Sequence, residues 1–358
     1  MSSNPPESSN PDSDPTPNQP LSTDELLPPV EPPNAGFILQ LFIVPAVIVL
    51  FVFLCVMVIG WAQSTKEDPA AKVQALRVGN QSRWQQAFEL AQLMLSNREQ
   101  SDELKKSSEL AGEVAKLLEE EIEAAEEDDN SVNLRYYLCR ILGEFHVDEG
   151  LAVLLRTARE DGQRDVRREA INAIAVLAHT LQTLDPPQSL SHPDLIDTLT
   201  HLADDQDDLI RSQTAYAIGV IVGQQEADER LMSELEKLSD DLYADARYNA
   251  AIALARRGHL HAVEALTEMF SVEAVGMSIS QEQSAALQAF KRNTMLRNAI
   301  EASGVLFEKN PKLDLPELTS AITQFVESPS AWDKPQPLPE QLLKQAKALL
   351  AKTGGAGP

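Results

Sequence analysis

An all-α fold built from stacked helix pairs is predicted by three features of this 358-residue sequence. From Ser64 onward the chain is rich in Ala, Leu, Glu and Gln, and few segments show the alternating pattern of a strand. An arginine-centred helical motif recurs along this part, and one long apolar run precedes it. Changes in composition divide the chain into a disordered tail (1–35), a transmembrane helix (36–62), a divergent helical start of the stack (63–130), the repeats (131–310), C-terminal capping helices (311–351) and a second disordered tail (352–358).

The first 35 residues contain ten prolines and six acidic residues but no Lys or Arg. Such a segment has too little apolar surface to offset the entropy that ordering would cost. We therefore expect an acidic, disordered N-terminal tail.

The apolar run LFIVPAVIVLFVFLCVMVI covers residues 41–59 and is interrupted only by Pro45. At about 1.5 Å per residue, a helix over 36–62 is long enough to cross a hydrocarbon core of roughly 30 Å. Basic residues follow the run at Lys66, Lys72 and Arg77, whereas none precedes it. The sequence thus predicts a single-pass membrane protein whose C-terminal part lies in the cytoplasm. A buried core helix and a cleavable signal peptide are the weaker alternatives.

The repeated motif consists of an apolar residue, an arginine, and small or apolar residues three, six and seven positions after that arginine. On a helical wheel these four positions fall within an arc of about 100°, which predicts a buried stripe. Successive arginines are 32, 44, 36 and 50 residues apart, enough for two helices each. One pair cannot bury its stripe alone, so neighbouring pairs must stack. The motif arginines are Arg135, Arg167, Arg211, Arg247 and Arg297.

An arginine in the first turn of a helix opposes the helix dipole, so we expect each one to have a fixed carboxylate partner. Asp165 and Asp245 stand two residues before their arginines, and Asp208 stands three before. We expect these residues to cap their helices and to pair with an arginine of the same or the next repeat, forming a structural ladder. The alternative is a set of solvated surface pairs worth under about 1 kcal/mol each.

Three segments resemble the second helices of HEAT repeats, of the short bacterial kind related to the HEAT-like repeats of phycobilin lyases. They are DVRREAINAIAVLA (165–178), DLIRSQTAYAIGVIVG (208–223) and DARYNAAIALARRG (245–258). The resemblance implies a HEAT-like α-solenoid, a right-handed superhelix of helix pairs that binds proteins, and it implies no catalytic residues. Asn133 and Thr294 depart from the pattern in the first and last copies.

Positions one and five after the motif arginine lie opposite the buried stripe and carry several Tyr and Arg residues. These types are enriched at protein-binding hot spots. We interpret them as a ridge that binds a partner segment. The alternative is that amphipathic tyrosines fall at these positions by chance. The candidate ridge consists of Tyr136, Arg140, Arg168, Tyr216 and Tyr248.

Little in the sequence indicates catalysis. The nucleotide-binding glycine motifs, the G-x-S-x-G elbow and H-E-x-x-H do not occur. Cys55 and Cys139 are far apart, and His259 and His261 lack a third metal ligand. Acidic clusters at 119–129 and 204–208 are interpreted as solvated helix ends, with a basic partner and calcium as the respective alternatives. The formal charge of −25 and the lack of a Lys/Arg-rich tract argue against nucleic acid as a ligand.

We therefore expect no enzyme activity, no cofactor, no metal and no small-molecule substrate. The predicted function is a membrane-anchored scaffold or adaptor that binds a protein partner at the cytoplasmic face. One alternative places the same solenoid outside, in envelope organisation. Another is a lyase-like factor for cofactor attachment or maturation.

Overall fold

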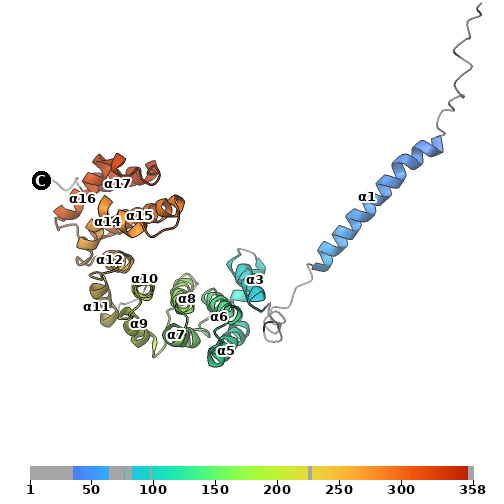
Figure 1. Cartoon of the computed structure of the whole chain (residues 1–358), viewed down its shortest axis with the longest axis horizontal. Coiled ribbons are helices and arrows are strands. Elements are labelled where there is room, and N and C mark those ends of the chain that lie inside the picture. The colour runs from blue at the N-terminus through green and yellow to red at the C-terminus, as the bar shows by residue number, and fades with distance from the viewer. Residues whose placement is uncertain (1–34, 64–75, 77–82, 97–98, 225–227, 354–358) are drawn as a thin grey trace, which may run out of the picture. The chain divides into compact units, whose positions relative to one another are not determined.

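A computed structural model of the chain describes residues 35–63, 76, 83–96, 99–224 and 228–353 (Figure 1). The segments 1–34 and 354–358, which make up most of the two predicted disordered tails, lie outside the described residues. So do Lys66, Lys72 and Arg77, on which the predicted orientation depends. The chain separates into two compact units, Met1–Lys66 and Glu67–Pro358.

The described part of the first unit is one helix, α1 (Ala35–Gln63), with Pro45 inside it. Among the described residues, no helix is both long enough and apolar enough to span a membrane. The prediction of a transmembrane helix over 36–62 was therefore wrong. The fold class is all-α with repeated helix pairs.

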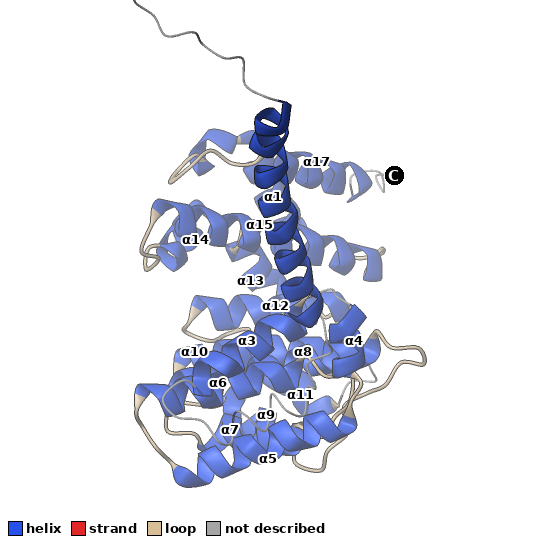
Figure 2. Cartoon of the chain, turned by 90° about the vertical axis from the view of Figure 1, so that its right-hand side faces the viewer, coloured by secondary structure: helices blue, strands red, loops and turns tan. Residues whose placement is uncertain are grey.

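The second unit is helical throughout its described elements, and Figure 2 shows no strand among them. In chain order these elements are α3 (Arg83–Leu95), α4 (Glu99–Lys105), α5 (Ser108–Ala124), α6 (Asp129–Gly143), α7 (Leu151–Glu160), α8 (Arg164–Gln182), α9 (Leu195–Ala203), α10 (Asp208–Gln224), α11 (Glu229–Leu238), α12 (Ala244–Arg257), α13 (Ala262–Glu268), α14 (Val272–Ile279), α15 (Ala285–Lys309), α16 (Pro316–Glu327), the 3₁₀-helix η2 (Pro329–Trp332) and α17 (Glu340–Thr353).

These helices form two layers (Figure 1). In one, which we call the second-helix layer, each helix packs on the next in the order α3, α6, α8, α10, α12, α15, α17. The other, the first-helix layer, contains α5, α7, α9, α11, α13 and α16. Contacts between α5 and α6, α7 and α8, α9 and α10, and α11 and α12 join the layers. The second unit is therefore a stack of helix pairs.

The predicted stripe of the arginine motif forms the buried side of the second-helix layer. The residues before the five arginines, Leu134, Val166, Ile210, Ala246 and Leu296, are at most 1% exposed. The residues after the arginines at the motif spacings are also buried, except for half-buried Gly304. Burial of one stripe against its neighbours supplies most of the stability that such helices lack alone.

Small residues set how closely the helices of this layer approach. A Cβ at Gly143 in α6 would lie 2.9 Å from the Cα of Ala173 in α8. One at Gly219 in α10 would lie 2.8 Å from the Cβ of Ala253 in α12. Real Cβ atoms do not approach this closely, so glycine is required at both contacts. The two glycines stand at the same position of the motif, eight residues after Arg135 and Arg211.

Candidate functional site

Four of the five motif arginines form ion pairs that link one helix pair to the next. Each guanidinium reaches a carboxylate that lies at or just beyond the end of the following first-layer helix. The pairs are Arg135 with Asp161 (2.7 Å), Arg167 with Asp205 (3.3 Å), Arg211 with Asp241 (2.7 Å) and Arg247 with Glu268 (2.5 Å). The Arg135 and Asp161 side chains are only 4% and 2% exposed, so this pair lies inside the protein.

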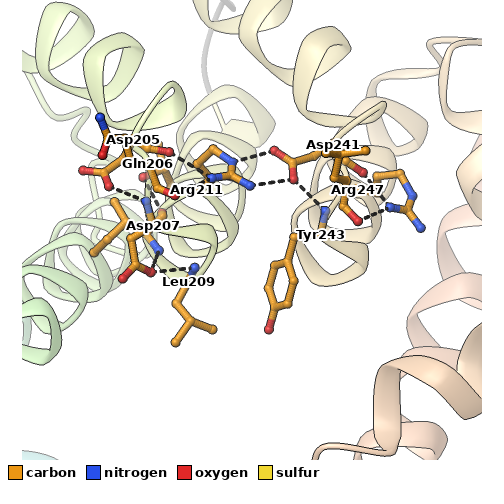
Figure 3. Close-up of polar contacts among 11 residues, drawn as sticks. Asp205, Gln206, Asp207, Leu209, Arg211, Asp241, Tyr243 and Arg247 are labelled. Carbon is orange, nitrogen blue, oxygen red and sulfur yellow. Dashed lines mark hydrogen bonds and ion pairs between the residues drawn. The ribbon is translucent and has the colours of Figure 1, made fainter.

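Two of these carboxylates, Asp205 and Asp241, also organise the turns into their own second-layer helices (Figure 3). Oδ1 of Asp241 accepts a hydrogen bond from the Tyr243 N–H at 2.7 Å, and its main-chain carbonyl accepts one from Arg247 Nη1 at 2.5 Å. Asp205 repeats the arrangement: its Oδ1 accepts from the Asp207 N–H, and its carbonyl accepts from Arg211 Nη1. Each turn therefore bonds an arginine of its own repeat and one of the preceding repeat.

The aspartates that we expected in the ladder lie elsewhere. Asp165 and Asp245 stand in the first turns of α8 and α12, where Gln163 and Tyr243 are the N-cap residues. Asp208 is the first residue of α10. Asp165 contacts exposed Arg164 at 3.7 Å and half-buried Arg168 at 3.5 Å. Asp245 accepts hydrogen bonds from Lys291 Nζ at 2.8 Å, Ser278 Oγ at 3.1 Å and the Tyr243 hydroxyl at 3.2 Å.

A signal for the actual partners is present in the sequence. Asp161, Asp205 and Asp241 each stand six residues before a motif arginine. That spacing is invariant over three repeats, whereas the aspartates we chose stand two or three residues before. The partners were missed because each lies six residues before the arginine of its own repeat, while its side chain pairs with the arginine of the preceding repeat.

The fifth motif arginine is not one of the four arginines in the ion-pair ladder. Arg297 in α15 is exposed, whereas Arg292, in the same helix, is only 1% exposed. Nη1 of Arg292 donates to the main-chain carbonyls of Trp332, Lys334 and Gln336, at 2.5, 2.7 and 2.9 Å. Burial lowers the pKa of this guanidinium. Arg292 thereby fastens the segment after η2 to α15.

Two members of the candidate ridge, Tyr136 and Arg168, line one pocket of about 490 Å³. Its walls come from α6 and α8, with one residue from α10. Glu169, only 8% exposed, is the most deeply buried charged group in it. The lining residues are Val132, Asn133, Tyr136, Tyr137, Asp165, Val166, Arg168, Glu169, Asn172 and Gln213.

Burial raises the pKa of the Glu169 carboxyl, although the positive charge of Arg140 and hydrogen bonds from Tyr136 and Asn172 act in the opposite direction. Burial, followed by the charge of Glu169, also raises the pKa of the Tyr136 hydroxyl. Gln213 Nε2 donates to Asn172 Oδ1 at 3.4 Å, which connects α10 to this network. The pocket thus contains a carboxylate that is incompletely compensated for its loss of water.

Aromatic rings extend the pocket wall toward α3. Tyr136 and Tyr137 meet edge to face with centroids 5.2 Å apart. Trp84 stacks on Tyr137 at 6.4 Å, and Phe88 meets it edge-on at 5.3 Å. Phe88 remains 39% exposed. These contacts fix the two tyrosine rings between α3 and the pocket.

The other ridge tyrosines lie apart from the pocket. Tyr216 in α10 is 44% exposed. Tyr248 in α12 is only 3% exposed, and its hydroxyl donates to Glu268 Oε1 at 3.0 Å. Tyr248 is therefore a packing residue beside the Arg247–Glu268 ion pair. Helical spacing within α12 does not show this burial, because Glu268 comes from α13.

No set of three or more His, Cys, Asp or Glu side chains in the described part of the chain is arranged to hold a metal ion. His259 and His261 instead face acidic residues at the end of α11. His259 Nε2 lies 3.0 Å from Glu236, and His261 Nε2 lies 3.8 Å from Asp240.

One stretch of the repeats is similar to a known family. Residues 118–218 match the model for HEAT repeats. The match covers less than half of the chain and supports HEAT-like repeats in that stretch. The matched stretch contains Arg135, Arg167 and Arg211, and the ion-pair ladder continues beyond it to Arg247 and Glu268.

Two solved structures are distantly similar to this chain. The Escherichia coli protein YibA is 18% identical, with a TM-score of 0.36 over 80% of this chain and 98% of its own. An engineered protein is 15% identical, with a TM-score of 0.32 over 76% of this chain and 97% of its own. No curated protein matches the sequence.

Proposed function

We propose that this protein is a non-catalytic HEAT-repeat scaffold that binds a protein partner along its second-helix layer, at the pocket between α6, α8 and α10. The observation that carries the proposal is Glu169, a carboxylate that is 8% exposed, lies in the pocket and belongs to no rung of the ladder. A poorly compensated buried charge costs stability, and such groups cluster at functional sites.

The ladder supports this role because it holds the pocket in shape. Arg135 in α6 pairs with Asp161, which also accepts a hydrogen bond from the Gln163 N–H at the start of α8. The two helices that form most of the pocket are therefore fixed to one turn. A site that is rigid before binding loses less conformational entropy when a partner docks.

Charge favours a basic partner. The whole chain carries 55 acidic and 30 basic residues, a formal charge of −25. A field of this sign speeds the approach of cationic segments and slows that of acidic ones. The effect weakens as salt is added, because exposed charges are screened.

The proposal is tested by affinity capture with the full chain and with the triple variant Tyr136→Ala, Arg168→Ala, Tyr216→Ala. The matched control is Met277→Ala, Phe290→Ala, Arg297→Ala, which removes exposed apolar and arginine side chains from α14 and α15. We expect the same captured proteins with the wild type and the control, and their loss with the triple variant, whose folded state is verified by circular dichroism before capture. Equal capture by all three would contradict the site, and no capture by the wild type would contradict the scaffold role.

A further inference from the structure

The pocket has the chemical character of a site for one cationic side chain. Two carboxylates, Asp165 and Glu169, and two tyrosine rings line it. Its one lining cation, Arg168, lies 3.5 Å from Asp165 through Nη1 and Oδ1. A guanidinium or ammonium group entering beside Glu169 would meet negative charge in a place where water screens it weakly.

The polar neighbours hold Glu169 in position. Tyr136 and Asn172 are polar neighbours that favour its ionised carboxylate, and Gln213 Nε2 donates to Asn172 Oδ1 from α10. Arg140 contributes positive charge, but burial still raises the pKa of the Glu169 carboxyl. A further cation would therefore lower the free energy of the ionised carboxylate.

The aromatic wall suits the apolar part of such a side chain. Arg and Lys carry methylene stems that pack on rings while the charged end stays polar, and a cation near a tyrosine ring gains about 0.5–2 kcal/mol. Tyr136 and Tyr137 present rings 5.2 Å apart, and Trp84 and Phe88 support Tyr137 from α3.

We propose that the pocket binds an arginine or lysine side chain of the partner segment, with its charge at Glu169 and its stem against Tyr136 and Tyr137. This inference rests on the proposed function, since it names the chemistry by which the scaffold recognises a segment. An acidic side chain fits less well, because Asp165 and Glu169 would both repel it.

The test uses the full chain with ¹³C-labelled tyrosine rings. The sequence has five tyrosines, of which Tyr136 and Tyr137 line the pocket while Tyr216, Tyr243 and Tyr248 serve as internal references. Separate samples are titrated with N-acetyl-arginine amide, N-acetyl-norleucine amide and N-acetyl-glutamate amide. We expect saturable shifts of the two pocket tyrosines with the arginine compound only.

Two variants make the test specific. Glu169→Gln keeps the shape but removes the charge, and we expect it to weaken binding of the arginine compound about tenfold or more. The matched control is Glu234→Gln, which changes a carboxylate that is 5% exposed in α11, away from the pocket. We expect this variant to bind the arginine compound as the wild type does.

Several outcomes would overturn the proposal. Shifts with the glutamate compound would make the pocket an anion site, and equal shifts with norleucine would make it an apolar site. Binding that survives Glu169→Gln, or saturation with none of the compounds, would remove the cation site. Binding of the arginine compound without protein capture would leave the pocket intact and contradict the scaffold role instead.

Discussion

The carboxylate of Asp241 accepts hydrogen bonds from Nε and Nη2 of Arg211, at 2.7 and 2.9 Å, across the boundary between two repeats. This two-point contact fixes both the distance and the orientation of the guanidinium plane. Burial raises the pKa of Asp241, but its bonds to Arg211 and the Tyr243 N–H outweigh burial, and the net pKa is lowered. Registration between neighbouring repeats thus depends on a charged, directional contact in addition to apolar packing.

Replacing Asp161 by Ala should destabilise the second unit by about 3–5 kcal/mol, because it leaves the Arg135 guanidinium buried without its partner. Asp165→Ala is the control, since that side chain is 67% exposed and its pairs are worth under about 1 kcal/mol. Urea unfolding monitored by circular dichroism measures both. Equal losses for the two variants would show that the ladder does not stabilise the stack.

The lowered pKa of Asp241 predicts that part of the protein's stability is lost in acid. Its pKa in the folded state is lowered from 3.8, so its stabilising contribution is present above that value and is lost as the pH falls through the folded-state pKa. We expect Asp241→Asn to destabilise the protein at pH 7 and the difference from wild type to disappear at lower pH. Urea midpoints measured between pH 7 and pH 2.5 test this. Asp240→Asn, at a 69% exposed side chain, should show little difference at any pH.

The raised pKa of Glu169 predicts that its effect on stability depends on pH in the opposite direction. Its folded-state pKa is raised from 4.5, so the ionised carboxylate costs stability above that pKa, and the cost disappears as the pH falls below 4.5. Glu169→Gln should therefore have a higher Tm than wild type at pH 7, and the two should converge in acid. Calorimetry across this range gives the answer. A lower Tm for Glu169→Gln at pH 7 would mean that Glu169 serves stability and not binding.

The close approach of α10 and α12 predicts that a second substitution restores stability lost through the first. Gly219→Ala should cost about 1–3 kcal/mol, because its Cβ would lie 2.8 Å from that of Ala253. Adding Ala253→Gly removes the opposing atom and should recover part of the loss. Gly112→Ala in α5 is the control: no atom lies within 4 Å of its Cβ, so it should stabilise by about 0.5–1 kcal/mol. A loss in the double variant as large as in Gly219→Ala alone would exclude this contact as the cause.

The sequence predicts the helix pairs well, because the stripe around each motif arginine follows from helical periodicity alone. Its burial at Leu134, Val166, Ile210, Ala246 and Leu296 needed no knowledge of tertiary partners. The prediction of a transmembrane helix over 36–62 was wrong, because no described helix is both long and apolar enough to span a membrane.

The candidate site is predicted less well, because its chemistry depends on contacts between repeats. Tyr136 and Arg168 meet at one pocket, but Glu169 was not identified, since a carboxylate two residues after a motif arginine gives no sign of its burial. Tyr248 has the same motif position as Tyr136 yet is buried against Glu268. A helical wheel places a side chain on one face but cannot show what a neighbouring helix places over it.

The six-residue spacing between Asp205 and Arg211 recurs between Asp241 and Arg247, and the two arginines are 36 residues apart. Excising residues 206–241 would join Asp205 to Leu242 and leave Arg247 six positions after Asp205. Arg167 would keep its carboxylate, and Arg247 would find a carbonyl at the position it now uses. A duplication of the same segment would insert one further helix pair, with an arginine and a carboxylate at the spacings that the neighbouring ion pairs use. The chain can therefore gain or lose length in whole units during evolution without exposing an unmatched charge.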